Sequence, residues 1–249
     1  MGIDRDTTFT WYGHACLELR TPGGRTLLID PWFGNPNSPR AAADVDVCDV
    51  MLVTHGHFDH LGAGGNGPPD AVAIAERTRP AWPAIHELSL WLAGQLGAAA
   101  DGVVGMNKGG RVEANGVGIT MVHADHSAGD LLGGDQPIYL GEPVGFILEL
   151  ENGFRVYAAG DTTAFSDMRL IAELHKPELA ILPIGGHYTM GPREAALAVG
   201  MLGVQHVVPV HYGTFPVLAG TPDQLRSELA GRGLDRVQVH QTEPGGSMA

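Results

Sequence analysis

Short apolar runs separated by turn residues fill the N-terminal part of the chain. The runs at residues 9–12, 15–19 and 26–29 are divided by glycine-containing turns such as Pro22-Gly23-Gly24, which is typical of strands joined by tight turns. A fourth run, at residues 49–53, is apolar after its first residue and predicts a strand buried on both faces. The pattern therefore predicts a β-sheet at the start of the fold.

Helical and strand patterns alternate along the remainder of the chain. Apolar spacing and helix-start residues predict helices over residues 69–78, 83–96, 165–174 and 192–202, and another that begins with the capping sequence Thr221-Pro222-Asp223-Gln224. Apolar runs predict strands over residues 111–113, 118–122, 145–150, 154–158, 179–184, 206–210 and 236–240. Strands followed by helices occur twice, so we expect two similar halves that meet near residues 123–145. The fold class that satisfies this order is α/β (α+β), a four-layer αββα sandwich forming one domain over residues 1–249.

Composition and charge narrow the class of protein. A chain of 249 residues with 44% hydrophobic and 17% charged residues can bury a substantial core. The net charge of −13 predicts a surface that repels nucleic acid and anionic membranes, so we expect a small-molecule substrate, no nucleic-acid partner and no membrane partner. Homo-oligomer formation stays open. Cys16 and Cys48 lack CxxC spacing, and no apolar stretch reaches the ~20 residues of a membrane span, so we expect buried, reduced thiols in a cytoplasmic protein.

Potential metal ligands are concentrated directly after the buried run at residues 49–53, in Thr54-His55-Gly56-His57-Phe58-Asp59-His60. Alternation along an extended chain places His55 and His57 on one face, and Asp59 and His60 follow after the chain turns. A polar loop with satisfied histidines is the plainer interpretation. The density of ligand-type residues after an apolar strand favours a metal site instead.

Further ligand-type residues stand at the ends of later strands. A single zinc ion would be saturated by four protein ligands and would leave no open position for substrate. His126, Asp161 and His211 each lie at the end of an apolar run, where they could share one rim of the sheet. The sequence therefore predicts a larger metal centre that draws on several strand ends.

These motifs resemble, in order, those of the metallo-β-lactamase superfamily. The carrying residues are THGHFDH, His126, Gly160-Asp161-Thr162 and His211, with Leu28-Ile29-Asp30-Pro31 as the first motif. The flanking segments are similar to the β-lactamase-like metal-dependent hydrolase branch related to ascorbate-6-phosphate lactonase. Those segments are Trp11-Tyr12-Gly13-His14-Ala15, Tyr139-Leu140-Gly141-Glu142-Pro143, Phe165-Ser166-Asp167-Met168, Glu173-Leu174-His175-Lys176-Pro177 and His211-Tyr212-Gly213-Thr214-Phe215-Pro216.

The resemblance implies a binuclear centre. It places His55, His57 and His126 on one divalent metal and Asp59, His60 and His211 on the other, with Asp161 bridging. A shared carboxylate can offset the repulsion of two dications held ~3.5–4 Å apart. Many true β-lactamases have cysteine at the Asp161 position, so the aspartate argues against antibiotic hydrolysis. Imidazole and carboxylate ligands suit zinc, which we expect, with Mn²⁺ or Fe²⁺ as alternatives.

Three residues are expected close to the metals without binding them. Asp30 would orient a ligating imidazole or the loop that carries His55, the alternative being a turn-capping aspartate. The resemblance brings His14 near the mouth of the pocket, although a structural turn histidine is the equal alternative. His187 follows two glycines and faces either substrate or solvent.

A metal-dependent hydrolase is the function that these expectations favour. A water shared by two dications loses a proton near neutral pH and becomes the nucleophile, and the catalytic residue Asp59 would orient it and move its proton. We expect a small ester, lactone or phosphorylated metabolite as substrate. The alternatives are a phosphodiesterase or nuclease, and an iron-binding redox or sensor protein of the same fold.

Overall fold

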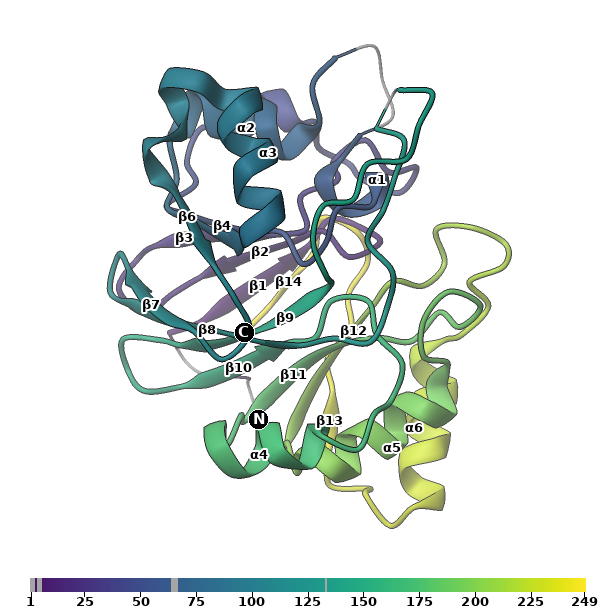
Figure 1. Cartoon of the computed structure of the whole chain (residues 1–249). Coiled ribbons are helices and arrows are strands. Elements are labelled where there is room, and N and C mark those ends of the chain that lie inside the picture. Colours follow the sequence, from purple (N-terminus) through teal and green to yellow (C-terminus); the bar gives the residue numbers. More distant parts are fainter. Residues whose placement is uncertain (1–2, 4–5, 64–66, 133) are drawn as a thin grey trace.

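The computed structural model describes residues 3, 6–63, 67–132 and 134–249. Four layers are stacked in it (Figure 1): helices α2 (Asp70–Thr78) and α3 (His86–Leu96) cover a first sheet, and the first sheet faces a second. On the outer face of the second sheet lie α4 (Met168–His175), α5 (Pro192–Leu202) and α6 (Pro222–Gly231). This arrangement confirms the αββα sandwich expected from the sequence.

The first sheet has the strand order β14-β1-β2-β3-β4. Its strands are β1 (Thr8–Trp11), β2 (Leu17–Arg20), β3 (Thr26–Ile29), β4 (Val50–Leu52) and β14 (Ser247–Met248). The first three form an antiparallel meander, and β4 joins parallel to β3, with Leu27 opposite Val50. All three residues of β4 are buried, as its apolar pattern predicts. The C-terminal segment returns to pair with the first strand, Met248 lying opposite Phe9.

The second sheet has the order β13-β12-β11-β10-β9-β8-β7. Its strands are β7 (Arg111–Ala114), β8 (Val117–His123), β9 (Val144–Glu149), β10 (Arg155–Ala158), β11 (Leu179–Pro183), β12 (His206–Val210) and β13 (Gln238–Val239). Strands β10 to β13 are parallel, whereas β9 runs antiparallel to both of its neighbours, β8 and β10. Two antiparallel steps restore direction, so β8, β10 and β12 all end at the same edge. That edge positions the functional site.

Side-chain alternation divides the interior into two cores. In β9, Phe146 and Leu148 belong to the core between the sheets, whereas Ile147 belongs to the core beneath α4, α5 and α6. Strand β10 repeats this pattern, because Val156 points into the first core and Tyr157 into the second. Full burial of such a side chain stabilises the fold by about 1.5–3 kcal/mol. The two cores therefore fix which face of the second sheet meets which layer.

Two smaller predictions, the buried free cysteines and the capping box of α6, are also confirmed. Cys16 and Cys48 are buried free thiols. The capping box of α6 is formed, since Thr221 Oγ1 accepts from the Gln224 amide at 3.2 Å and Gln224 Oε1 accepts from the Thr221 amide at 2.9 Å. In the part of the chain that the structure describes, no helix has the length and apolar character needed to cross a bilayer.

Two expectations about element boundaries are wrong. The helix expected over residues 83–96 begins only at His86, because Trp82–Ile85 forms strand β5, which pairs in parallel with β6 (Val103–Met106). The helix expected from residue 165 begins at Met168. The short helices α1 (Phe58–Leu61), η1 (Ala42–Asp44) and η2 (Gly97–Gly102) complete the elements.

The boundary between the two halves also differs from the expected one. The chain passes from the first pair of layers to the second between β6 and β7, earlier than residues 123–145. The reason is that β7 and β8 already belong to the second sheet, while the C-terminal β14 belongs to the first.

Candidate metal centre

The His-rich segment lies where β4 ends, at the edge of the sandwich that receives the ends of β8, β10 and β12. The Thr54 carbonyl oxygen accepts a hydrogen bond from the Val144 amide at 2.9 Å, which ties this segment to the start of β9. Gly56 is required by close packing, because a Cβ there would lie 2.5 Å from Leu140 Cδ1. The chain then turns into α1, which carries Asp59 and His60. Figure 1 shows α1 beside the loop that follows β8, whose Asp130 accepts a hydrogen bond from the Phe58 amide.

Three imidazoles form the part of the centre that we call the imidazole half: His55, His57 and His126. Their candidate ligand atoms all lie within 4.8 Å of one another, and His55 Nε2 is 2.8 Å from His57 Nδ1. His55 is buried, whereas His57 and His126 are partly exposed. Burial lowers the pKa of all three imidazoles. The neutral form, which offers a lone pair to a metal, is thereby favoured.

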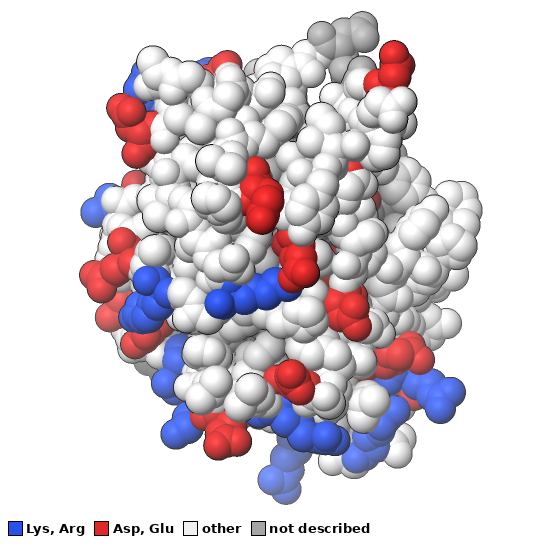
Figure 2. Space-filling view, in the orientation of Figure 1, with Lys and Arg blue, Asp and Glu red and all other residues white. Residues whose placement is uncertain are grey.

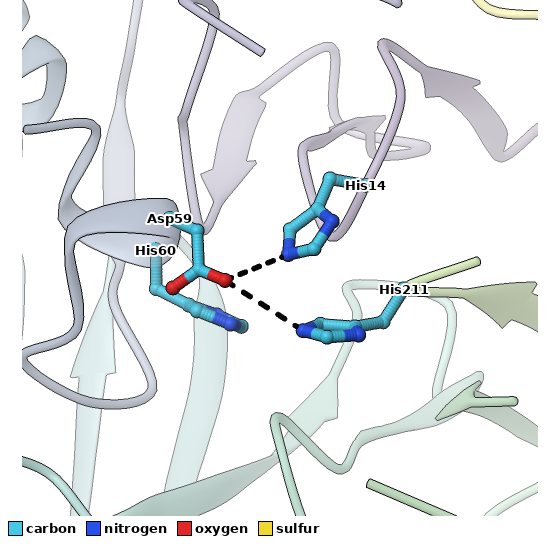
Figure 3. A group of neighbouring side chains, drawn as sticks. All are labelled: His14, Asp59, His60 and His211. Carbon is cyan, nitrogen blue, oxygen red and sulfur yellow. Dashed lines mark hydrogen bonds and ion pairs between the residues drawn. The ribbon is translucent and has the colours of Figure 1, made fainter. Parts of the chain in front are cut away.

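Asp59, His60 and His211 form what we call the carboxylate half. Together with His14 they make a second group whose candidate ligand atoms lie within 4.8 Å of one another, and their side chains point into one space (Figure 3). Asp59 Oδ2 lies 3.0 Å from His14 Nε2 and 3.8 Å from His211 Nε2. Burial raises the pKa of Asp59, but the hydrogen bond from His14 and the charge of His60 lower it by more than burial raises it. The net shift of the pKa is therefore downward. Asp59 is therefore an anion in this setting.

Asp161 lies between the two halves. Its Oδ2 is 3.5 Å from His126 Nε2 and 3.1 Å from His211 Nε2, and its Oδ1 is 3.4 Å from His60 Nε2. The carboxylate thus faces one imidazole of the imidazole half and two of the carboxylate half. Burial raises its pKa, yet His211 and His60 hold the pKa well below its usual range. An ionised carboxylate at this place is suited to bridge two cations.

Unpartnered buried atoms test whether these residues fit metal ions. His60 Nε2, Asp161 Oδ1 and both ring nitrogens of His211 have no hydrogen-bond partner although they are buried. Leaving such atoms unpaired costs about 1–3 kcal/mol each, so native proteins nearly always satisfy them. The short contacts of Asp161 with the His60 and His211 rings lack hydrogen-bond geometry. This is expected for ligand atoms that all point toward a metal position between them. Buried imidazole and carboxylate donors of this kind fit divalent metals.

Asp30 and Thr54 support this arrangement from behind. Asp30 Oδ1 accepts from the Thr54 amide at 2.8 Å, and Asp30 Oδ2 accepts from the Thr54 hydroxyl at 2.9 Å. The same Oδ2 lies 2.9 Å from His60 Nδ1, while Thr54 Oγ1 lies 3.0 Å from His55 Nδ1. Both rings are thereby held with Nε2 turned toward the centre, the usual arrangement of a ligating histidine.

The raised pKa of His60 shows that the buried carboxylates around it favour a positive charge at this position. Burial lowers its pKa, but the carboxylates of Asp161 and Asp30 raise it well above its ordinary value. A proton on His60 therefore balances two buried negative charges when no other cation does so. A divalent metal would replace that proton, because only the neutral ring offers a lone pair.

Comparison with known proteins agrees with this geometry. A family profile described as a β-lactamase superfamily domain matches residues 25–212, which span β3 to the residue after His211. The chain belongs to this superfamily. Two relatives named UPF0173 metal-dependent hydrolase support the assignment. The protein of Koribacter versatilis is 45% identical over 237 residues, covering 95% of each chain, and that of Rubrobacter xylanophilus is 44% identical over 240 residues, covering 96% and 95%.

A solved structure extends the comparison to three dimensions. The metallo hydrolase Igni18 of the archaeon Ignicoccus hospitalis matches with a TM-score of 0.81 and 34% identity over 97% of each chain. The chain is therefore a metal-dependent hydrolase of the metallo-β-lactamase fold. The narrower likeness to ascorbate-6-phosphate lactonase stays a prediction from the sequence motifs.

The two other candidate residues, His14 and His187, differ in burial: His14 is buried and His187 is exposed. His14 is fully buried and reaches Asp59. Burial lowers its pKa to about 4, against the opposing effect of Asp59. His187 is exposed on the loop between β11 and α5, where its ring meets Tyr188 at 4.4 Å. Among the interactions of the described residues, none joins His187 to the metal-binding groups.

Sequence reasoning did not single out two hydroxyl residues of the site. Thr54 links Asp30 to His55, and Thr214 Oγ1 lies 2.9 Å from His14 Nδ1. Thr54 immediately precedes the His-rich motif, which is a signal that could have indicated it. Thr214 lies 200 positions from His14 along the chain, and only the fold brings them together.

Proposed function

We propose that this metallo-β-lactamase-fold protein hydrolyses a small ester or lactone at a centre of two divalent metals, with phosphorylated metabolites as the next substrate class. The position of Asp161 carries the proposal, because its carboxylate faces both halves of the centre at 3.1–3.5 Å. His55, His57 and His126 would hold one metal, and Asp59, His60 and His211 the other. Imidazole and carboxylate donors suit zinc, and the absence of a thiolate among them keeps Mn²⁺ and Fe²⁺ as alternatives.

In the proposed reaction, the carboxylate half supplies the residue that transfers a proton. Metals held here would supply Lewis-acid polarisation of the scissile bond and lower the pKa of a nearby water molecule. Asp59 is an anion at neutral pH and lies at the rim, with 14% of its side chain exposed. We therefore assign it the role of accepting a proton from the attacking water and returning it to the leaving group. His60 and His211 are buried, and we assign them the role of metal ligands without a part in proton transfer.

The charge distribution supports a small substrate. Seven of the lysine and arginine side chains in the described ranges form ion pairs with Asp or Glu. None of these pairs involves Asp59 or Asp161. On the face shown in Figure 2, acidic and basic side chains are interspersed, without the continuous basic stripe that nucleic-acid binding needs. Among the described residues, no lysine or arginine is paired with Asp59 or Asp161, so no side-chain cation bound to them would select a phosphate group, and we place the carbonyl substrates first.

A hydrolase panel on metal-replete protein tests the proposal. Lactones, carboxylic esters, thioesters and phosphodiesters are assayed side by side, with Asp161→Ala as the inactive variant and Asp125→Asn as the control. Asp125 is exposed and lies beside His126 in sequence, so its charge is removed without touching the centre. We expect carbonyl substrates to be hydrolysed at rates that Asp161→Ala abolishes and Asp125→Asn retains. Turnover of phosphodiesters alone would favour a phosphodiesterase or nuclease instead.

Metal content is measured on the same preparations. We expect close to two transition-metal ions per chain, because seven candidate ligands converge in two groups joined by Asp161. No more than trace metal after metal-supplemented expression would contradict the proposal. Elemental analysis with a visible spectrum separates zinc from iron.

A further inference from the structure

His14 occupies an unusual turn between β1 and β2. Gly13 and His14 both have positive φ angles, +95° and +51°, and the turn closes with the Cys16 amide donating to the Gly13 carbonyl oxygen at 3.0 Å. A non-glycine residue in this region is strained by about 1–3 kcal/mol and persists only where its surroundings hold it. The contacts of His14 show what holds it and what it holds in turn.

Both the ring and the main chain of His14 contact the carboxylate half. The ring places Nε2 3.0 Å from Asp59 Oδ2 and Nδ1 2.9 Å from Thr214 Oγ1. The carbonyl oxygen accepts the His211 amide at 2.9 Å, and the His14 and His211 rings lie 3.9 Å apart. His211 is itself at φ +55°. One buried residue thus fixes the backbone of His211 and the side chain of Asp59.

The two ring nitrogens of His14 differ from the metal-facing atoms. His60 Nε2 and His211 Nε2 are buried without hydrogen-bond partners, as atoms that await a metal should be. Both nitrogens of His14 have partners, and its Nε2 is directed at a carboxylate oxygen. A carboxylate can only accept, so this bond requires the proton on Nε2. Nδ1 must then accept, and the Thr214 hydroxyl can donate to it, which a carbonyl oxygen could not do.

We infer that His14 is a positioning residue, which donates its Nε2 proton to Asp59 and is fixed in that tautomer by the Thr214 hydroxyl. The inference rests on the role proposed above for Asp59. Free rotation of the Asp59 carboxylate would let it leave the orientation in which it accepts a proton from water. His14 prevents this from one side, while the metal site bounds it on the other. Partners that orient groups in this way are typically worth about 10–100-fold in activity or metal affinity.

Hydroxyl variants of Thr214 test the inference without altering His14. In Thr214→Val the donor to Nδ1 is lost at nearly constant shape, and in Thr214→Ser it is kept. We expect kcat on a substrate found in the panel to fall by roughly tenfold in Thr214→Val, the usual effect of one lost hydrogen bond, with KM nearly unchanged. Thr214→Ser should restore kcat to within about twofold of the parent. Thr78→Val, in α2, is the matched control, since the Thr78 hydroxyl donates to the Ile74 carbonyl oxygen far from the site.

A spectroscopic measurement on zinc-loaded, ¹⁵N-histidine-labelled protein gives a readout independent of turnover. The His14 signals, assigned by their loss in His14→Gln, should show the Nε2–H tautomer in the parent and a change in Thr214→Val. An Nδ1–H tautomer with Nε2 bound to metal would overturn the inference and make His14 a ligand. Equal kcat in Thr214→Val and the parent, or no recovery in Thr214→Ser, would overturn it as well. If no substrate is turned over, the proposed function fails, while the tautomer still decides the place of His14.

Discussion

The imidazole half and the carboxylate half of the centre are held in different ways. His57 and His126 are partly exposed, and the contact behind the ring of His57 is a 3.4 Å approach from the Ser127 hydroxyl to Nε2. In the carboxylate half, His60 and His211 are buried and Asp59 is nearly so. Asp30 is bonded to the His60 ring, and His14 to Asp59. The half that carries buried charge is also the half with the more extensive support.

Physical chemistry accounts for the difference. The neutral imidazoles of His57 and His126 lie near water, lose little hydration and need few partners, while buried His55 has Thr54 behind it. A buried carboxylate must be paired and hydrogen-bonded. Asp30, Asp59 and Asp161 place three carboxyl groups around His60 and His211. Asp30 accepts hydrogen bonds from Thr54 and Asp59 contacts His14, whereas Asp161 Oδ1 has no hydrogen-bond partner. We therefore expect function to be more sensitive to the surroundings of the carboxylate half than to those of the imidazole half. The predictions that follow test this from the largest effect to the smallest.

Asp161→Ala should have the largest effect, because it removes the group common to both halves. We expect metal content to fall from two ions per chain to about one, and activity to fall by roughly 10³-fold or more, since a single electrostatic group at a reacting centre already contributes 10²–10³. Circular dichroism should show an intact fold, because the two hydrophobic clusters that join the layers are built from apolar side chains, and Asp161, although buried, belongs to the metal centre. A variant with two metals and near-normal turnover would show that Asp161 does not bridge.

Asp59→Asn should affect chemistry more than binding. It keeps the shape and an oxygen ligand but removes the negative charge and the proton acceptor, so kcat should fall by roughly 10²–10⁴ while KM changes little. Metal at His55, His57 and His126 should persist, and metal in the carboxylate half should weaken. Kinetics and metal analysis on the same sample measure both effects. A rise in KM alone, with kcat intact, would make Asp59 a binding residue.

Asp30→Asn tests the support behind the carboxylate half. Its amide nitrogen would face either the His60 ring or the Thr54 donors, so one of those bonds would be lost. We expect the affinity for the metal of this half to fall by about 10–100-fold, measured by competition with a chelator. Asp125→Asn serves again as the exposed control. Equal affinities for Asp30→Asn and the parent would mean that the His60 ring does not depend on Asp30.

The sequence predicts the layers, the cluster of ligand-type residues and the place of Asp30 beside them better than it predicts the hydroxyl contacts of Thr54 and Thr214. Buried strands and amphipathic helices can be predicted from the periodicity of their apolar residues. His55 to His60 can be found because they follow the end of one such strand. The apolar spacing of α3 continues backwards through residues 83–85 and therefore predicts helix there. Their strand pairs with residues 103–106, a partner that no local pattern reveals. The contact of His14 with Thr214 depends in the same way on the packing of the whole fold.

The smallest expected effect concerns a hydroxyl in the imidazole half. Ser127 Oγ lies 3.4 Å from His57 Nε2 and the residue is exposed, whereas Thr214 Oγ1 lies 2.9 Å from His14 Nδ1 in a half-buried position. Both are contacts between a hydroxyl and a histidine ring, so the two substitutions form a matched pair across the centre. Ser127→Ala should change kcat and metal content by less than about twofold, in the range of ordinary surface substitutions. Thr214→Val, measured in parallel, should lose roughly tenfold in kcat. A loss in Ser127→Ala as large as that in Thr214→Val would show that the two halves depend equally on their hydroxyl contacts, and the expected difference in sensitivity would be wrong.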